Sequence, residues 1–170
     1  AFVAQLKDAG GIWFTGGRQW RFVDAYAGTK TEAAMHAVLA RGGAIGGTSA
    51  GASIQADYMV RGDPLGNTVM MAEGYERGLG FLQGVAIDQH FTQRKRQPDL
   101  ELVTSRFPQL LGIGLDEGTA IIVRGSIAEV VGKNRVTIYD AMRPPRTGAV
   151  DHEALTAGCR YNLNKRHKVE

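Results

Sequence analysis

The sequence predicts an α/β fold with a largely parallel sheet and an antiparallel extension at its C-terminal end. In the first two-thirds of the chain, short apolar segments alternate with stretches rich in helix-forming residues. In the last third, apolar segments follow one another with only turns between them. Alternating strands and helices are typical of parallel sheets, whereas consecutive strands joined by turns pair antiparallel. No repeat or linker divides the sequence, so we expect one domain over residues 1–170.

Glycine pairs separate the predicted elements of the first half. Gly16-Gly17 follows an apolar run, and Gly42-Gly43 follows a stretch of helix formers, where glycine favours the end of a helix. A segment of small residues comes next, and we expect a helix to resume after it. The predicted elements are strand 11–15, helix 31–40, strand 44–47 and a helix that continues to residue 58.

The second half begins with a long glycine-rich segment, residues 61–84, which predicts loops. Short runs of β-branched and aliphatic residues then predict strands, with one stretch of helical character among them. The predicted elements are strand 85–88, helix 100–107, and strands 112–115, 119–123, 128–131 and 136–139.

The composition excludes several classes of protein. Of 170 residues, 44% are apolar and 22% are charged, which is ordinary for a globular protein. No stretch approaches the roughly 18 apolar residues of a transmembrane helix, so we expect no membrane partner. The net charge of +3 is modest, and we interpret the basic residues 160–168 as a solvated end, not as a nucleic-acid site. The single Cys159 allows no intrachain disulfide, and both a cytoplasmic and a secreted location stay open.

Residues 47–51 (GTSAG) match the pattern G-x-S-x-G between a predicted strand and a predicted helix. In this context the serine sits on a sharp turn with its hydroxyl exposed, and only small neighbours fit around it. The start of the following helix stabilises developing negative charge, so the amide of Ala50 is a natural oxyanion donor. The alternative is a glycine-rich turn without chemistry. We favour Ser49 as a nucleophile over Ser53, which lies one turn into the helix.

A serine nucleophile needs a base, and the chain has four histidines. Only His90 directly follows a predicted strand, and ligands gather at the carboxyl ends of strands in such sheets. Asp116 and Glu117 follow another strand in the same way and could orient the imidazole. The order Ser49, His90, Glu117 differs from the serine, acid, histidine order of α/β-hydrolases, which argues against a lipase or esterase.

With these residues in place, the chain resembles the cyanophycinase family of serine peptidases, which are relatives of the aspartyl dipeptidases. The motifs that carry the resemblance occur in order along nearly the whole chain. They are residues 13–19 (WFTGGRQ), 47–53 (GTSAGAS), 88–91 (DQHF), 93–96 (QRKR) and 112–120 (GIGLDEGTA).

The resemblance implies a flavodoxin-like, doubly wound fold and a Ser-His-Glu triad. Carried over to this sequence, Ser49 is the nucleophile, His90 the base and Glu117 its orienting partner. The second oxyanion amide, beside that of Ala50, would come from Gly17. No metal or organic cofactor is implied. The family's substrate pocket corresponds to five residues here: Gln19, Asp88, Gln89, Arg94 and Arg96.

The resemblance also implies a substrate, cyanophycin, which has an aspartate backbone with arginine on each β-carboxyl. The family's enzymes cut this polymer and release the dipeptide β-aspartyl-arginine. Arginines suit carboxylate recognition, and Asp88 could hold a guanidinium or an amine. Two departures bear on this substrate. Pro98 and Asp99 stand where the family has a third arginine, and Arg18 stands where an acid usually follows the glycine pair. The alternatives are an aspartyl dipeptidase-like enzyme acting on short acidic peptides and a non-catalytic binding member of the fold.

The resemblance finally bears on what surrounds this chain. Family members carry further strand–helix units at the N-terminal side, so residues 1–170 correspond to the C-terminal two-thirds of the family fold. We therefore expect a separate N-terminal segment of the same fold as a partner. Dimers are common in the family, which makes a homodimer a second expectation.

Overall fold

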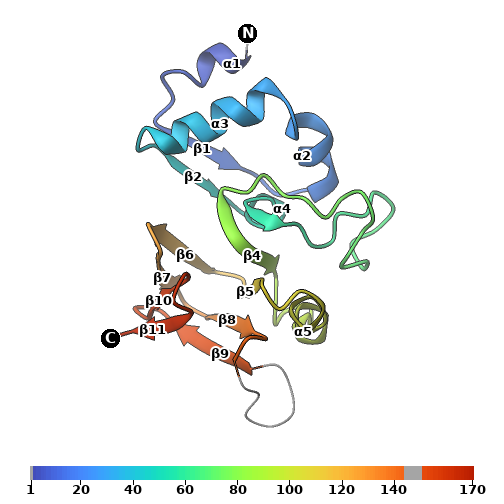
Figure 1. Cartoon of the computed structure of the whole chain (residues 1–170), viewed down its shortest axis with the longest axis vertical. Coiled ribbons are helices and arrows are strands. Elements are labelled where there is room, and N and C mark those ends of the chain that lie inside the picture. Colours follow the sequence, from blue (N-terminus) through green and yellow to red (C-terminus); the bar gives the residue numbers. More distant parts are fainter. Residues whose placement is uncertain (1, 144–150) are drawn as a thin grey trace. The chain divides into compact units, whose positions relative to one another are not determined.

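The computed structural model describes residues 2–143 and 151–170, which form two compact units, residues 1–87 and 88–170 (Figure 1). The first unit is built around short parallel strands and helices. Its elements are α1 (Phe2–Gln5), β1 (Gly11–Phe14), α2 (Gln19–Tyr26), α3 (Lys30–Ala40), β2 (Ala44–Gly47), α4 (Ala50–Ser53), β3 (Ala56–Tyr58) and β4 (Leu82–Gln89), whose last residues belong to the second unit.

In the first unit, β1 and β2 pair in parallel, with Gly11 opposite Ala44 and Phe14 opposite Gly47. Helices α3 and α4 each contact both strands. Apolar side chains from these elements form a buried cluster, and their removal from water stabilises the unit. The fully or nearly fully buried members are Leu6, Phe14, Met35, Val38, Ile54, Met59 and Leu79.

One aromatic side chain of β1 lies outside this cluster. Trp13 is 67% exposed, and its ring covers Gly46 of the neighbouring strand so closely that a Cβ at Gly46 would come within 2.6 Å of it. A side chain at position 46 would therefore displace the indole from its place against β2.

The predicted helix to residue 58 is wrong beyond α4. Helix α4 ends at Ser53, and β3 pairs in parallel with β4. The cause is competition for carbonyl groups, because the Ile54 oxygen accepts from Leu79 N at 2.8 Å and the Gln55 oxygen from Leu82 N at 2.9 Å. Helix α2 was not predicted, although Phe22, Val23 and Tyr26 pack their apolar faces against the core cluster.

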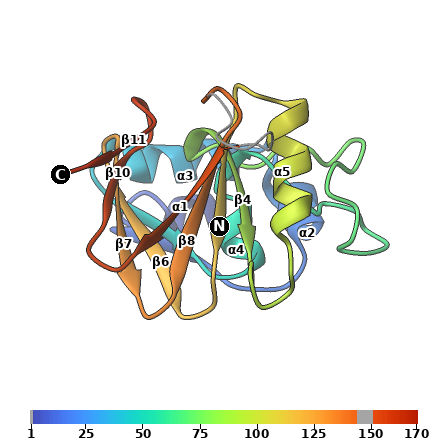
Figure 2. The same cartoon turned by 90° about the horizontal axis from the view of Figure 1, so that it is seen from below.

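The second unit is mostly antiparallel, as the sequence predicts for the last third. Strand β8 lies between β5 and β9 in antiparallel pairing, and β6 and β7 form a hairpin that continues into β10 and β11. Helix α5 packs against β5 and β8. Figure 2 shows α5 as the yellow-green helix of this unit. The elements are α5 (Gln97–Arg106), β5 (Leu111–Leu115), β6 (Thr119–Arg124), β7 (Ile127–Gly132), β8 (Arg135–Asp140), β9 (Asp151–Thr156), β10 (Arg160–Asn162) and β11 (His167–Val169).

The prediction of a solvated basic end is wrong for one residue. Residues 160–169 carry β10 and β11, and the Arg166 side chain is only 20% exposed. Its guanidinium donates to Asp140 Oδ1 at 2.7 Å and to the Gln109 carbonyl. Arg160, Lys165 and Lys168 are exposed, as predicted.

Within residues 2–143 and 151–170, no helix is both long and apolar enough to span a bilayer.

Candidate active site

Ser49 occupies a strained turn between β2 and α4. Its φ is 54° and its ψ is −121°, a conformation that residues other than glycine rarely adopt. Strand β2 ends at Gly47 and α4 begins at Ala50, so the turn has no room for a gradual change of direction. Backbone strain of this kind costs about 1–3 kcal/mol and persists only where the surrounding structure imposes it.

The two glycines of the motif allow the chain to make this turn. A Cβ on Gly51 would clash with the Phe14 carbonyl and come within 2.6 Å of the Thr15 oxygen. A Cβ on Gly47 would clash with the Gly51 carbonyl and come within 2.9 Å of the Phe14 oxygen. The G-x-S-x-G spacing therefore reflects close contact of three backbone segments, β1, β2 and α4.

The predicted oxyanion residues belong to segments beside Ser49. A Cβ on Gly16 would lie 3.4 Å from Ser49 Cβ, so the Gly16-Gly17 loop runs alongside the serine. Gly17 has a φ of 135°, which favours glycine. Ala50, the first residue of α4, is fully buried.

The residues after this loop do not extend into solvent. Gln19, predicted to line a substrate pocket, is 3% exposed, and its Nε2 donates to the Val60 carbonyl at 3.4 Å. Arg18 donates to the carbonyls of Asp63, at 2.7 Å, and Gly66. The Arg18 guanidinium is thus bound to the loop that follows β3.

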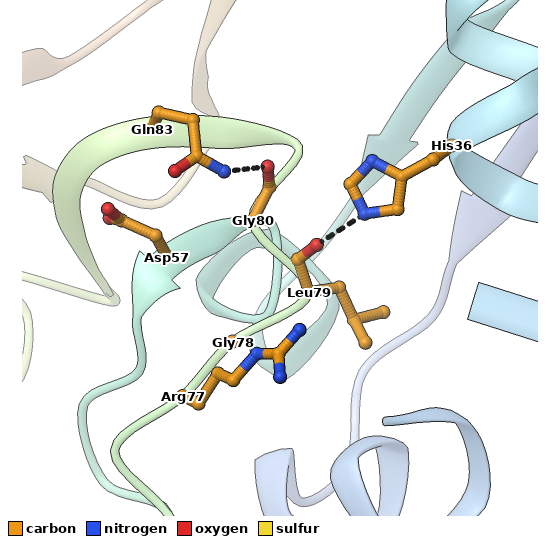
Figure 3. A pocket seen from close by; sticks show the side chains of 7 residues that line it. All are labelled: His36, Asp57, Arg77, Gly78, Leu79, Gly80 and Gln83. Atoms are coloured by element: carbon orange, nitrogen blue, oxygen red, sulfur yellow. Dashed lines mark hydrogen bonds between the residues drawn. The ribbon is translucent and has the colours of Figure 1, made fainter. Parts of the chain in front are cut away.

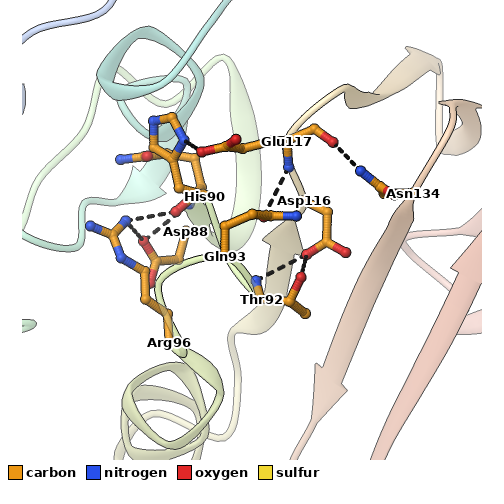
Figure 4. A network of polar contacts seen from close by, with 9 residues as sticks. Asp88, His90, Thr92, Gln93, Arg96, Asp116, Glu117 and Asn134 are labelled. Atoms are coloured by element: carbon orange, nitrogen blue, oxygen red, sulfur yellow. Dashed lines mark hydrogen bonds and ion pairs between the residues drawn. The ribbon is translucent and has the colours of Figure 1, made fainter.

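In the second unit, His90 and Glu117 form a direct hydrogen bond. The distance from His90 Nδ1 to Glu117 Oε1 is 2.7 Å, and Figure 4 shows the imidazole facing the carboxylate. His90 directly follows β4 and has a φ of 51°, a second strained position. The side chain of His90 is 25% exposed and that of Glu117 is 54% exposed. With Nδ1 donating to Glu117, the remaining ring nitrogen, Nε2, is the one able to accept a proton.

The main chain of Glu117 is fixed on both sides. Its amide donates to Gln93 Oε1 at 3.1 Å, and its carbonyl accepts from Asn134 Nδ2 at 2.6 Å (Figure 4). Sequence reasoning assigned no role to either side chain. Gln93 lies in one of the motifs that carry the family resemblance, whereas Asn134, in the turn between β7 and β8, carried no signal.

Asp116, the other acid at this strand end, has a different contact. Its Oδ1 accepts from the Thr92 amide at 3.0 Å and from the Thr92 hydroxyl at 2.7 Å. Asp116 is 5% exposed. This carboxylate therefore holds the segment after His90, while Glu117 contacts the imidazole itself.

Three of the predicted pocket residues are buried together beneath His90. Arg96 donates to Asp88 Oδ1 at 2.9 Å and to the Gln89 carbonyl at 2.6 Å. The side chains of Arg96 and Asp88 are 5% and 0% exposed. Gln89 is also buried, and its Oε1 has no hydrogen-bond partner within the described residues. Arg94, by contrast, is exposed.

A second histidine, His36, lines a cavity of about 220 Å³ in the first unit (Figure 3). Its Nε2 lies 2.8 Å from the Leu79 carbonyl. Asp57, on the same cavity, accepts from the amides of Tyr58, Gly84 and Val85 at 2.8–3.0 Å. Both side chains therefore support the backbone around β3 and β4. Among the described residues, no cluster of three or more His, Cys, Asp or Glu side chains could hold a metal ion.

Known proteins share sequence with most of this chain. Cyanophycinases from Geminocystis herdmanii and Trichormus variabilis are each 37% identical, over 132 and 145 residues, or 76% and 81% of this chain. These stretches are 48% and 47% of the relatives, so the chain spans about half the length of the curated relatives it matches.

Solved structures give the same picture of the fold. A peptidase from an acI-B1 Actinobacterium superposes with a TM-score of 0.69 and 26% identity, covering 95% of this chain and 62% of that one. A putative peptidase E from Listeria monocytogenes has a TM-score of 0.53 and 20% identity, covering 77% and 62%. This chain is thus a mixed α/β protein with parallel and antiparallel strands, like these peptidases.

The model of Peptidase family S51 matches residues 1–131, a range that includes Ser49, His90 and Glu117. The strained serine turn and the His90–Glu117 pair thus fall within the stretch shared with that family, and the chain belongs to Peptidase family S51.

Proposed function

We propose that this protein is a serine peptidase in which Ser49 is the nucleophile, His90 the general base and Glu117 the group that orients His90. The observation that carries the proposal is the backbone of Ser49, because a strained serine between a strand and a helix is the arrangement of an activated nucleophile. The 2.7 Å bond from His90 to Glu117 supplies an oriented imidazole.

The proposed reaction follows the usual acyl-transfer sequence. Ser49 Oγ bonds to the scissile carbonyl carbon while its proton passes to Nε2 of His90. The tetrahedral oxyanion accepts hydrogen bonds from the amides of Gly17 and Ala50. The carbon–nitrogen bond then breaks, and His90 donates its proton to the departing amine. Water, deprotonated by His90, hydrolyses the Ser49 ester and restores the free hydroxyl.

The proposed substrate is cyanophycin or a related β-aspartyl peptide, since the matched relatives are cyanophycinases. We assign direct substrate contact to Arg94, whose side chain is exposed and suits a carboxylate. Gln19, Asp88, Gln89 and Arg96 are buried, so we assign them to the walls and support of the pocket. Asp99 lies in the first turn of α5, where an acid is favourable, which accounts for it without a substrate role.

We also propose that the full fold is the flavodoxin-like, doubly wound sheet that the resemblance implies. The parallel pairs β1–β2 and β3–β4 and the helices on β1 and β2 support this arrangement.

The decisive experiment is dipeptide release from purified cyanophycin, measured by mass spectrometry for the protein and for Ser49→Ala. We expect β-aspartyl-arginine from the parent and a loss of at least about 10⁴-fold in the variant, because the nucleophile is gone. A fluorophosphonate probe on Ser49 provides the control for the chemistry. A labelled Ser49 without dipeptide release would shift the substrate to short acidic peptides, and an unlabelled Ser49 would refute the peptidase mechanism.

A further inference from the structure

Arg18 and Gln19 connect the Gly16-Gly17 loop to a segment about 45 residues further along the chain. Arg18 occupies the N-cap position of α2, and its side chain donates to the carbonyl oxygens of Asp63, at 2.7 Å, and Gly66 instead of capping the helix. Gln19 donates to the Val60 carbonyl at 3.4 Å. Charge-assisted hydrogen bonds are stronger than neutral ones, so the Arg18 contacts dominate this connection.

The segment that receives these bonds, residues 60–70, has its own internal support. Arg61 is 3% exposed, has a φ of 59°, and donates from Nη1 to the Asn67 carbonyl at 2.8 Å. The Arg61 amide donates to the Met70 carbonyl at 3.1 Å, and the Leu65 amide to Asp63 Oδ1 at 2.9 Å. Segment 60–70 is therefore a preformed loop, able to serve as an anchor.

The other end of the connection lies beside the reacting serine. Gly17, which immediately precedes Arg18, carries the proposed oxyanion amide, and Gly16 runs alongside Ser49. Glycines alone do not hold a loop in one conformation, since they allow the widest choice of backbone angles. Fixing Arg18 by its guanidinium restricts the position of the Gly17 amide directly upstream.

We propose that Arg18 is a positioning residue, which ties the oxyanion loop to segment 60–70 and so holds the Gly17 amide in place for the transition state. The proposal rests on the proposed function. It also accounts for an arginine at this position, because a carboxylate there could not donate to carbonyl oxygens. Misplacement of a donor by about 1 Å can cost about 100-fold in rate.

The test compares Arg18→Met with Arg21→Met in the full-length protein. Arg21 lies one turn further along α2, and its guanidinium rests over the Trp20 ring at 5.3 Å. Four quantities are measured: kcat and KM, the rate of fluorophosphonate labelling at Ser49, the melting temperature, and hydrogen exchange of the amides of residues 61–70. A further variant, Arg18→Lys, restores a positive donor without the guanidinium fork.

We expect Arg18→Met to lower kcat and the labelling rate about 10- to 100-fold with little change in KM, and to accelerate exchange in segment 61–70. Arg18→Lys should recover part of the rate, and Arg21→Met should behave like the parent. A lower melting temperature with kcat unchanged would make Arg18 merely structural and overturn the proposal. Unchanged exchange in segment 61–70 would overturn the anchoring. A parent protein that fails to label would refute the proposed function itself, and the positioning role with it, before any variant is compared.

Discussion

The turns at Ser49 and His90 both hold a residue in a strained backbone conformation, but different interactions hold it there. Each lies within two residues of the end of a strand, and each places a residue other than glycine at a positive φ, 54° and 51° respectively. Around Ser49 the constraint is steric, because Gly47 and Gly51 let carbonyl groups approach where side chains would not fit. Around His90 the constraint is polar, because buried charged side chains hold the chain before and after it.

The difference shows two ways to maintain strain at a functional position. The small residues that the steric turn requires lie within a few positions in the sequence, although Gly47 and Gly51 also approach the Phe14 carbonyl of β1. The polar turn depends on Asp88, Arg96 and Asp116, which must each find their partner in the folded chain. We therefore expect the His90 turn to be the more sensitive of the two to substitution of side chains around it.

The largest effect on the reaction rate in this comparison should come from Glu117, the acid that contacts His90. Glu117→Gln keeps the size of the side chain but removes the negative charge beside His90, so the imidazolium formed during reaction loses its stabilisation. We expect kcat to fall by about 10²- to 10⁴-fold with the circular-dichroism spectrum unchanged. Glu129→Gln, on β7, is the control and should leave kcat as it is. Full activity in Glu117→Gln would assign the orienting role to another acid.

The next effect concerns the buried pair below His90. Arg96→Met removes the positive charge that faces the Asp88 carboxylate, and breaking a buried pair typically costs about 3–5 kcal/mol. Chemical denaturation should show this loss of stability. The exposed Arg94→Met should change stability by less than about 0.5 kcal/mol and instead raise KM, which separates support from substrate contact. Equal stability of the two variants would contradict the polar account of this turn.

Alkaline pH offers a smaller, graded test of the same region. The ring of Tyr139 packs edge-on against Phe91, the residue after His90, with centroids 5.9 Å apart. Burial, and secondarily the Glu101 carboxylate, raises the pKa of Tyr139 from 10.0 to about 12. The unfolded chain releases this proton first, so the free energy of unfolding should fall as the pH rises from about 10 to about 12. Tyr139→Phe should reduce that pH dependence, and an unchanged slope would speak against the buried phenol.

The smallest effect on stability should be an increase caused by a substitution at the steric turn. Ser49→Gly permits the positive φ without strain and should stabilise the fold by about 1 kcal/mol, while abolishing activity. Ser49→Ala is the matched control, since it removes the hydroxyl but keeps the Cβ. The corresponding His90→Gly should bring no net gain, because it also removes the Glu117 hydrogen bond. Equal melting temperatures for Ser49→Gly and Ser49→Ala would show that the turn stores no strain.

The contrast between the turns also explains what the sequence could predict. The Ser49 turn could be predicted because the small residues that it requires occupy five consecutive positions in the sequence. The pairing of His90 with Glu117 could be proposed from strand ends, but the support from Asn134 could not, because nothing in the sequence links residue 134 to residue 117. Arg18 and Arg96 were interpreted as determinants of substrate binding, whereas their contacts are with the protein's own carbonyl and carboxylate groups.

The same limit applies to the fold. The strands β1, β2 and β4 to β8 and the mixture of parallel and antiparallel pairing followed from apolar runs and turns, whereas β3, β9, β10 and β11 were not predicted. The end of α4 could not be predicted in this way, because it depends on hydrogen bonds from the amides of Leu79 and Leu82 to the carbonyls of Ile54 and Gln55. Local patterns therefore predict where elements occur, and distant hydrogen bonds decide where they stop.

Trp13 can serve as an intrinsic fluorescent probe of the surface of the first unit. Its indole is largely in water, stacked on Gly46 at the outer side of β1 and β2, so its fluorescence should be red-shifted and open to collisional quenchers. Any chain that comes to lie on this strand pair would dehydrate the ring and shift its emission to the blue. Titration followed by tryptophan fluorescence, with Trp13→Phe as the blank, would therefore detect association at this face without an added label.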